Sequence, residues 1–319
     1  MKFNEAQEQA IRHIDGPCLV LAGPGSGKTA VITDRTRYLI EEAGIHPANI
    51  LVVTFTKAAA MEMQERFRTK MQGANVPCTF GTFHSIFFWI LRRAYGYTGN
   101  QIVSEEEKRK ILTELVQKME LEYEDEEEFI QNLIGEITLV KSEYMPIEHY
   151  YSTTCGEAEF RQLYQSYQER IQSERKLDFD DMLVYTYELL KERPDICRQW
   201  QEKFQYILID EFQDINHIQY EIVRMLSGDR RNLFVVGDDD QSIYRFRGAR
   251  PEIMLGFTKD YPEAEVILLN VNYRSSREIV EGSLRMIANN TKRYDKEIRS
   301  EQPYAAPICI HELKSPAEE

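Results

Sequence analysis

Long hydrophobic runs are absent from this sequence, and cysteine is scarce. The longest apolar segments, such as residues 17–22 and 207–209, are far shorter than the ~20 residues that a membrane-spanning helix needs. The first ten residues have no apolar stretch, so no secretory signal is expected. Of the five cysteines, the nearest two, Cys155 and Cys197, are 42 positions apart, which excludes CxxC metal clips and a disulfide scaffold. Together these absences predict a cytoplasmic protein.

The net charge of −14 is unevenly distributed along the chain. Residues 1–102 carry a net charge of +3, residues 103–173 carry −10, residues 174–269 carry −7, and residues 270–319 are neutral. Because the acidity is concentrated in the middle of the chain, a local basic face for nucleic acid is not excluded. With 42% hydrophobic and 29% charged residues, the composition is that of an ordinary soluble chain with ample material for a core.

Short apolar segments and helical patterns alternate along the first hundred residues. Strands are expected over 16–23, 49–55 and 76–82, with helices near 29–42 and 57–71 between them. Alternation at this spacing predicts a parallel sheet joined by crossover helices. The strand pattern returns at residues 203–212, 231–240 and 264–270.

A long helical pattern separates these two groups of strands. Ser104 and Glu107 have the form of a capping box, and only Pro146 interrupts the pattern before about Arg175. The 319 residues predict about two domains, and neither flank has enough strands for a sheet of its own. We therefore expect a first α/β domain of residues 1–102 and 174–269, a helical insertion of residues 103–173, and the beginning of another α/β domain over 270–319, with a helix near 276–289 and a strand near 307–313.

A glycine-rich loop follows the first expected strand and opens a helix. Its residues in order are Ala22, Gly23, Pro24, Gly25, Ser26, Gly27, Lys28 and Thr29. Glycines allow backbone N–H groups to turn towards phosphates, and the helix N-terminus adds a favourable dipole. Lys28 can reach the β- and γ-phosphates of ATP, and the Thr29 hydroxyl can bind Mg²⁺. The pattern predicts a nucleotide site.

Two carboxylates, Asp210 and Glu211, come directly after the apolar segment 206–209. Alone, such a pair is often only the solvated start of a loop. Together with a phosphate loop it predicts catalysis, because parallel strands end at the edge of the sheet where ligands bind. Asp210 is then expected to hold Mg²⁺ and Glu211 to polarise an attacking water.

A third group of residues follows the expected strand 231–240. Gln241 offers a neutral amide suited to sensing the γ-phosphate, and Tyr244, Phe246 and Arg247 come shortly after it. Aromatic rings beside arginines suit stacking on unpaired bases. The alternative is that Tyr244 and Phe246 pack in the core.

Several segments of the chain resemble sequence motifs of a known family and occur in the same order as those motifs. They are 3–11 (FNEAQEQAI), 22–29 (the glycine-rich loop), 54–63 (TFTKAAAMEM), 81–85 (GTFHS), 177–183 (LDFDDML), 210–214 (DEFQD), 237–248 (GDDDQSIYRFRG) and 269–276 (LNVNYRSS). This series resembles superfamily I DNA helicases of the UvrD/PcrA/Rep type. The resemblance covers almost the whole chain and is weakest across 105–170.

The resemblance implies both a fold and an activity. The fold is an α/β, RecA-like P-loop NTPase domain with a parallel sheet, interrupted by an all-helical inserted subdomain and followed by the start of a second RecA-like domain. The activity is that of an ATP-dependent DNA helicase with ATP and Mg²⁺ as cofactors. It would translocate on single-stranded DNA, 3′ to 5′, and act at duplex junctions.

For the nucleotide, the resemblance implies roles for four further positions. Gln7 matches a glutamine that contacts adenine, and an amide can pair with the adenine N6/N7 edge. Tyr273 matches a tyrosine that stacks on the adenine ring, and Arg274 an arginine that reaches the γ-phosphate. Ala30 stands where the family often has an arginine, so part of the adenine pocket differs here.

For DNA, the resemblance implies contacts from two kinds of side chain. Phe55, Tyr244 and Phe246 match aromatic residues that pack against bases, with Phe246 in place of the usual tryptophan. The other implied contacts, which are polar or charged, come from Thr54, Thr82, His84 and Arg247. A structural histidine is the alternative for His84.

The chain ends shortly after residues 269–276, and the family's later motifs are not in these 319 residues. We therefore expect the N-terminal portion of a longer helicase. One alternative is a module that holds ATP and Mg²⁺, and DNA, without turnover. Another is a different P-loop enzyme such as a small-molecule kinase, which would leave 81–85 and 244–247 unexplained.

Overall fold

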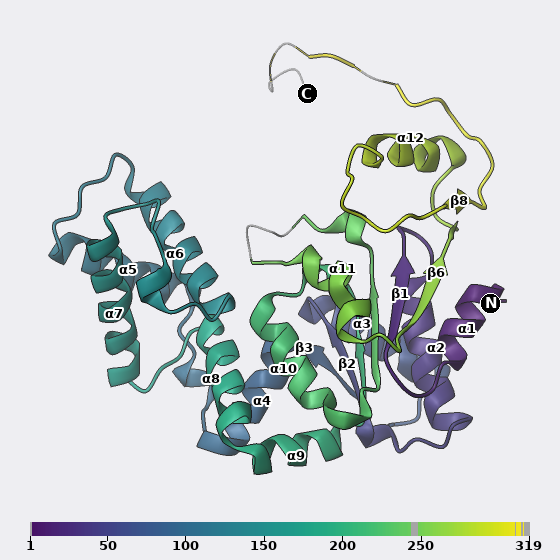
Figure 1. The fold of residues 1–319 in the computed structure, drawn as a ribbon, viewed down its shortest axis with the longest axis horizontal. Coiled ribbons are helices and arrows are strands. Elements are labelled where there is room, and N and C mark those ends of the chain that lie inside the picture. Colours follow the sequence, from purple (N-terminus) through teal and green to yellow (C-terminus); the bar gives the residue numbers. More distant parts are fainter. Residues whose placement is uncertain (1, 244–247, 310, 314, 316–319) are drawn as a thin grey trace.

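A six-stranded, fully parallel sheet forms the centre of the molecule (Figure 1). This computed structural model describes residues 2–243, 248–309, 311–313 and 315. The strand order is β3-β2-β4-β5-β1-β6, and every neighbouring pair is parallel. The strands are β1 (Cys18–Ala22), β2 (Ile50–Thr54), β3 (Thr79–Thr82), β4 (Tyr206–Ile209), β5 (Leu233–Gly237) and β6 (Glu265–Leu269). Six of the seven strands predicted from the sequence are confirmed, with shorter bounds.

Helices cover both faces of this sheet, and the four inner strands are buried along their whole length. In β1, Leu19 and Leu21 pack into one apolar layer, whereas Cys18, Val20 and Ala22 pack into the layer on the opposite face. Burial on both faces explains why these strands read as continuous apolar runs rather than as alternating ones.

The helices of the first layer come from both parts of the chain that supply strands. They are α4 (Phe83–Tyr95), α8 (Phe179–Glu192), α9 (Pro194–Lys203), α10 (His217–Ser227) and α11 (Pro251–Asp260). The second layer is built by α1 (Glu5–Arg12), α2 (Lys28–Glu41) and α3 (Lys57–Lys70).

Between β3 and β4 the described residues form helices, turns and loops, apart from one isolated bridge between Ile102 and Leu177. Three of these helices gather at one side of the molecule, away from the sheet (Figure 1). They are α5 (Glu105–Lys118), α6 (Glu126–Ser142) and α7 (Glu157–Ser173). They bury their own apolar cluster, which includes Leu112, Leu133 and Leu163.

A buried ion network ties these helices to α8. The Lys141 ammonium lies 2.9 Å from Asp178 and 2.8 Å from Asp181, and the Lys108 ammonium lies 2.9 Å from Asp180. Burial raises the pKa of Asp178, but Lys141 and Lys108 outweigh it and hold this pKa well below its ordinary value. Removing one partner of such a network would leave an uncompensated buried charge, so the network fixes the position of α5 and α6 against α8.

The last part of the chain forms a two-stranded parallel pair and one helix. These are β7 (Val271–Asn272), β8 (Arg299–Ser300) and α12 (Arg277–Ile287). Short 3-10 helices occur at η1 (Pro47–Asn49), η2 (Gly99–Gln101), η3 (Ile147–His149), η4 (Phe212–Asp214), η5 (Gly228–Arg230) and η6 (Asp239–Gln241). No helix among the described residues is long and apolar enough to cross a membrane.

Two sequence-based expectations are wrong in detail. Residues 307–309 and 311–313 form no strand; the only strand described after α12 is β8, which pairs with β7. The side chain of Ser104 does cap α5 by accepting from the Glu107 N–H. The Glu107 carboxylate, however, bonds the Lys176 ammonium at 2.6 Å, because a charged partner offers it a stronger hydrogen bond than the backbone does.

Candidate nucleotide site and nucleic-acid groove

The loop between β1 and α2 has a backbone that only glycine tolerates at two positions. Gly25 and Gly27 have φ angles of 67° and 88°, in the left-handed region. A Cβ on Gly25 would lie 2.6 Å from the Arg274 Cβ, and one on Gly27 would lie 2.9 Å from the Gln7 side-chain amide. The Ser26 hydroxyl donates to the Gly23 carbonyl at 2.7 Å and closes the turn. The loop is therefore a tight cradle of backbone that precedes a helix N-terminus.

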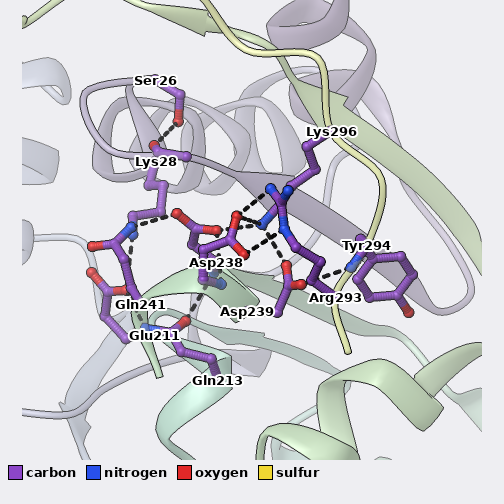
Figure 2. A network of polar contacts seen from close by, with 12 residues as sticks. Ser26, Lys28, Glu211, Gln213, Asp238, Asp239, Gln241, Arg293, Tyr294 and Lys296 are labelled. Carbon is purple, nitrogen blue, oxygen red and sulfur yellow. Dashed lines mark hydrogen bonds and ion pairs between the residues drawn. The ribbon is translucent and has the colours of Figure 1, made fainter. Parts of the chain in front are cut away.

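Lys28, the first residue of α2, reaches the end of β4. Its ammonium donates to the Glu211 carboxylate at 2.9 Å, across 183 positions of sequence (Figure 2). Glu211 itself has a left-handed backbone, with φ of 51°, a conformation that is unfavourable for a residue with a Cβ. The Gln213 side-chain amide donates to the same Glu211 oxygen at 3.0 Å. A strained residue held by two donors at a strand end is typical of a functional site.

Two buried carboxylates accompany this ion pair. One oxygen each of Asp210 and Asp214 has no hydrogen-bond partner, although both residues are only 7% exposed. Burial and the nearby Glu211 charge raise the pKa of both groups to about 6, and Lys28 opposes this shift. Such orphaned acceptors, held at a cost to stability, indicate a ligand that supplies positive charge.

Magnesium and a nucleoside phosphate fit these residues. Among the described residues, no group of three or more His, Cys, Asp or Glu side chains could hold a metal by itself. Mg²⁺ usually binds through one or two carboxylates together with substrate phosphates and water. The unpaired oxygen of Asp210, close enough to Lys28 to feel its charge, matches that donor set beside a backbone cradle for phosphates.

Residues predicted to read adenine and the γ-phosphate lie around the same loop. The Gln7 amide donates to the Ser26 carbonyl at 2.9 Å and its oxygen caps α1 by accepting from Asn4. The Tyr273 N–H donates to the Gly25 carbonyl at 3.0 Å, and Arg274 lies against Gly25. Segments from both ends of the chain therefore meet at the phosphate loop, and adenine contact by Gln7 and Tyr273 stays a prediction.

The turn after β5 completes the edge of the sheet. Gln241 donates its amide to the Asp238 carboxylate at 2.7 Å, and the Asp238 N–H donates to the Gln213 side chain at 3.0 Å. Sequence reasoning missed Gln213, Asp238 and the basic side chains that hold this turn, Arg293 and Lys296. The run of three aspartates, Asp238 to Asp240, was the available signal, because adjacent buried carboxylates require cations.

A groove of about 580 Å³ lies beside α6 and α8 and contains two of the predicted DNA contacts. Phe55 and His84 line it together with Phe179, Thr138 and Asp214. The His84 ring meets the Phe179 ring edge-on, with centroids 5.6 Å apart. Burial lowers the pKa of His84, against the opposing charges of Asp180 and Asp178.

The remaining predicted DNA contacts divide into two groups. Thr54 is buried and donates its hydroxyl to the Thr56 carbonyl, and the Thr82 hydroxyl caps α4 by accepting from Ser85. Both hydroxyls therefore already have structural partners. Tyr244, Phe246 and Arg247 lie outside the described residues.

Comparison with known proteins decides the family. Residues 3–262 match the family described as the UvrD/REP helicase N-terminal domain. The chain belongs to the UvrD/Rep helicase family. It is 41% identical over 305 residues to YjcD of Bacillus subtilis (strain 168). It is 37% identical over 321 residues to the ATP-dependent DNA helicase Rep of Escherichia coli (strain K12), and 37% identical over 316 residues to the ATP-dependent DNA helicase PcrA of Bacillus subtilis (strain 168).

These UvrD/Rep relatives are longer than the chain. The three alignments cover 93%, 97% and 97% of this chain but only 40%, 47% and 42% of the YjcD, Rep and PcrA proteins. The chain therefore spans less than half the length of the curated relatives that it matches. The residues matched to the UvrD/Rep family include the phosphate loop, Asp210, Glu211 and Gln241, and they exclude Tyr273, Arg274 and Lys296.

The raised pKa of Asp210 yields a prediction for stability. The folded chain holds a proton that the unfolded chain releases above about pH 4, so this carboxyl costs stability as pH rises through about 6. Asp210→Asn removes that cost. We expect it to increase the free energy of unfolding by about 1–3 kcal/mol at pH 8 and by much less at pH 4, measured by urea denaturation without nucleotide or Mg²⁺. The exposed Asp229 provides the control Asp229→Asn. Equal or lower stability of Asp210→Asn at pH 8 would contradict this electrostatic account of the site.

Proposed function

We propose that this chain is the ATP- and DNA-binding part of an ATP-dependent DNA helicase that translocates 3′ to 5′ on single-stranded DNA. The observation that carries the proposal is the meeting of Lys28 with Glu211 at the carboxyl edge of the sheet. Asp210 lies next to this pair, and Gln213 and Asp238 connect it to Gln241. One edge thus brings together a phosphate-binding lysine, a metal-binding carboxylate, a base and a polar sensor.

The proposed division into domains follows the packing. Residues 1–102 and 174–269 form a first RecA-like motor domain around the parallel sheet, and residues 103–173 form a helical insertion with its own apolar cluster. Residues 270–319 begin a second RecA-like domain. The separate core of the helical part and its buried ionic junction with α8 support this division.

In the proposed mechanism, Lys28 leaves Glu211 and binds the β- and γ-phosphates of ATP, with the backbone N–H groups of residues 23–29 around them. Thr29 and Asp210 would hold Mg²⁺, which when bound supplies positive charge to the phosphates. Release of Lys28 leaves the Glu211 carboxylate able to accept a proton from the attacking water. Gln241 and Arg274 would contact the γ-phosphate, where an amide and a guanidinium stabilise developing charge.

The adenine end of the nucleotide is assigned to Gln7 and Tyr273, which lie beside the phosphate loop. Gln7 and Tyr273 both bond to the loop backbone, at Ser26 and Gly25. We propose that Gln7 pairs with the adenine edge and that Tyr273, which is 39% exposed, stacks on the ring. The backbone from Ala22 to Ala30 is proposed to contact the nucleotide between its adenine ring and its phosphates.

DNA is assigned to the groove between the sheet's carboxyl edge and the helical insertion. Phe55 and His84 line that groove; Thr54 directly precedes Phe55, and Thr82 lies two residues before His84. Tyr244, Phe246 and Arg247 are proposed to add base stacking and a phosphate contact. Exposed Phe179 is a further aromatic surface in the groove, and unpaired bases stack on such rings without regard to sequence.

The nucleotide assignment predicts two distinct failures. Lys28→Ala should weaken binding of ATP with Mg²⁺ at least tenfold, because the charge on the phosphates is lost. Glu211→Gln should bind ATP within about threefold of the unaltered chain and slow hydrolysis by about 10²-fold or more, because only proton transfer is lost. Titration with a fluorescent ATP analogue and single-turnover hydrolysis with single-stranded DNA measure the two effects.

The exposed Lys118 provides the control Lys118→Ala, which should change neither quantity. If Glu211→Gln bound ATP more weakly but hydrolysed it at an unchanged rate, the assignment of phosphate binding to Lys28 and of proton transfer to Glu211 would be wrong. ATP binding with no hydrolysis by the unaltered chain would favour a binding module without turnover.

The DNA assignment predicts that Phe55→Ala weakens binding of single-stranded DNA about tenfold, since each base–aromatic stack is worth about 1–3 kcal/mol. Its affinity for ATP should stay unchanged. Fluorescence anisotropy with a labelled oligonucleotide measures the effect, and affinity should also fall with rising salt. Tyr151, which is 68% exposed and is not among the residues that line this groove, provides the control Tyr151→Ala. Equal loss in both variants would exclude the groove as the binding site.

A further inference from the structure

Three consecutive aspartates, Asp238 to Asp240, form the turn after β5. Asp238 is 1% exposed and Asp239 is 6% exposed. Adjacent carboxylates removed from water repel one another and are stable in ionised form only beside cations. The chain between residues 293 and 296, more than fifty positions later, supplies those cations.

The Lys296 ammonium is fully buried and lies at the centre of the three carboxylates (Figure 2). Its Nζ is 2.6 Å from Asp238, 2.6 Å from Asp239 and 2.8 Å from Asp240. An ammonium has three N–H donors, so each carboxylate takes one. Despite the opposing effect of burial, hydrogen bonds and charge from these aspartates raise the pKa of Lys296.

Two further residues, Arg293 and Tyr294, fasten the same segment. The Arg293 guanidinium bonds both oxygens of Asp240, at 2.8 and 2.7 Å. The Tyr294 N–H donates to Asp239 at 2.8 Å, and its hydroxyl donates to the Met254 carbonyl of α11. The clamp formed by Arg293, Tyr294 and Lys296 therefore fixes the whole turn.

The clamp reaches the phosphate sensor through Asp238. One oxygen of this carboxylate accepts from Lys296, and the other accepts from the Gln241 amide at 2.7 Å. The carboxylate thus cannot rotate towards or away from Gln241 unless its bond to Lys296 changes. On the other side, the Asp238 backbone joins Gln213, which bonds the Glu211 that pairs with Lys28.

We propose that Lys296 is a positioning residue for Gln241, acting through Asp238, and that it makes the segment of residues 293–296 part of the response to the γ-phosphate. This inference rests on the proposed function, in which Gln241 contacts that phosphate. Lysine suits the role better than arginine. A planar guanidinium fork matches one carboxylate with two donors, whereas three converging carboxylates require donors that radiate from one point.

The test compares affinity for a non-hydrolysable ATP analogue with affinity for ADP, both with Mg²⁺, because only the former has a γ-phosphate. In the unaltered chain we expect the ATP analogue to bind more tightly, and Gln241→Ala to reduce this preference. Lys296→Gln should reduce it about fivefold or more and leave ADP affinity within about twofold. The double variant Gln241→Ala/Lys296→Gln should be no worse than Gln241→Ala alone, because the two residues act on one contact.

The matched control is Lys292→Ala, at an exposed lysine directly before this segment, which should keep the full preference. A purely structural role for Lys296 would lower both affinities together or leave the preference intact, and either result would overturn the inference. If Lys296→Gln fails to fold by circular dichroism, Lys296→Arg, which keeps the charge, replaces it. Retention of the full preference by a folded Lys296→Arg would also overturn the inference. Failure of the unaltered chain to bind either nucleotide would instead overturn the proposed function.

Discussion

The ion pair between Lys28 and Glu211 is the interaction on which the site depends. It joins the first residue of α2 to the end of β4 at 2.9 Å, and it forms only if β1 and β4 are parallel and separated by β5 alone. That order requires strands buried on both faces, since helices must cross over each face to connect parallel strands. The apolar layers of the sheet, the tight loop of Gly25 and Gly27, and the left-handed Glu211 all serve to bring one cation and one anion together.

Several features of this edge of the sheet lower the stability of the folded chain. Asp210 and Asp214 each keep a buried oxygen without a partner, and Glu211 has a strained backbone. A positively charged ligand would give the two carboxylates the partner that they lack. The buried network of Lys108, Lys141 and Asp178 is different, because its charges are matched within the protein. The contrast between matched and unmatched buried charge separates the scaffold from the site.

Local patterns allowed much of this to be predicted from the sequence. The strands were predicted because short apolar runs such as 50–54 alternate with helical patterns, and the loop because its glycines and Lys28 stand together. The contacts that the sequence did not predict join residues that are far apart in the chain. Nothing near Lys296 in sequence marks it as the partner of Asp238, and the acceptor of Gln7 lies nineteen positions away at Ser26. The apolar residues near 307–313 suggested a strand, but strand formation depends on a neighbouring edge that local sequence does not encode. Tyr244 and Phe246, which are predicted to contact bases, lie outside the described residues.

In the proposed mechanism, Lys28 exchanges Glu211 for the phosphates of ATP, and this exchange frees the carboxylate for catalysis. A crystal structure with a non-hydrolysable ATP analogue and Mg²⁺ tests it most directly. We expect the Lys28 ammonium on the β- and γ-phosphates, the metal beside Asp210 and Thr29, and Glu211 no longer paired with Lys28. A nucleotide bound with the pair between Lys28 and Glu211 intact, or bound away from residues 22–29, would contradict it.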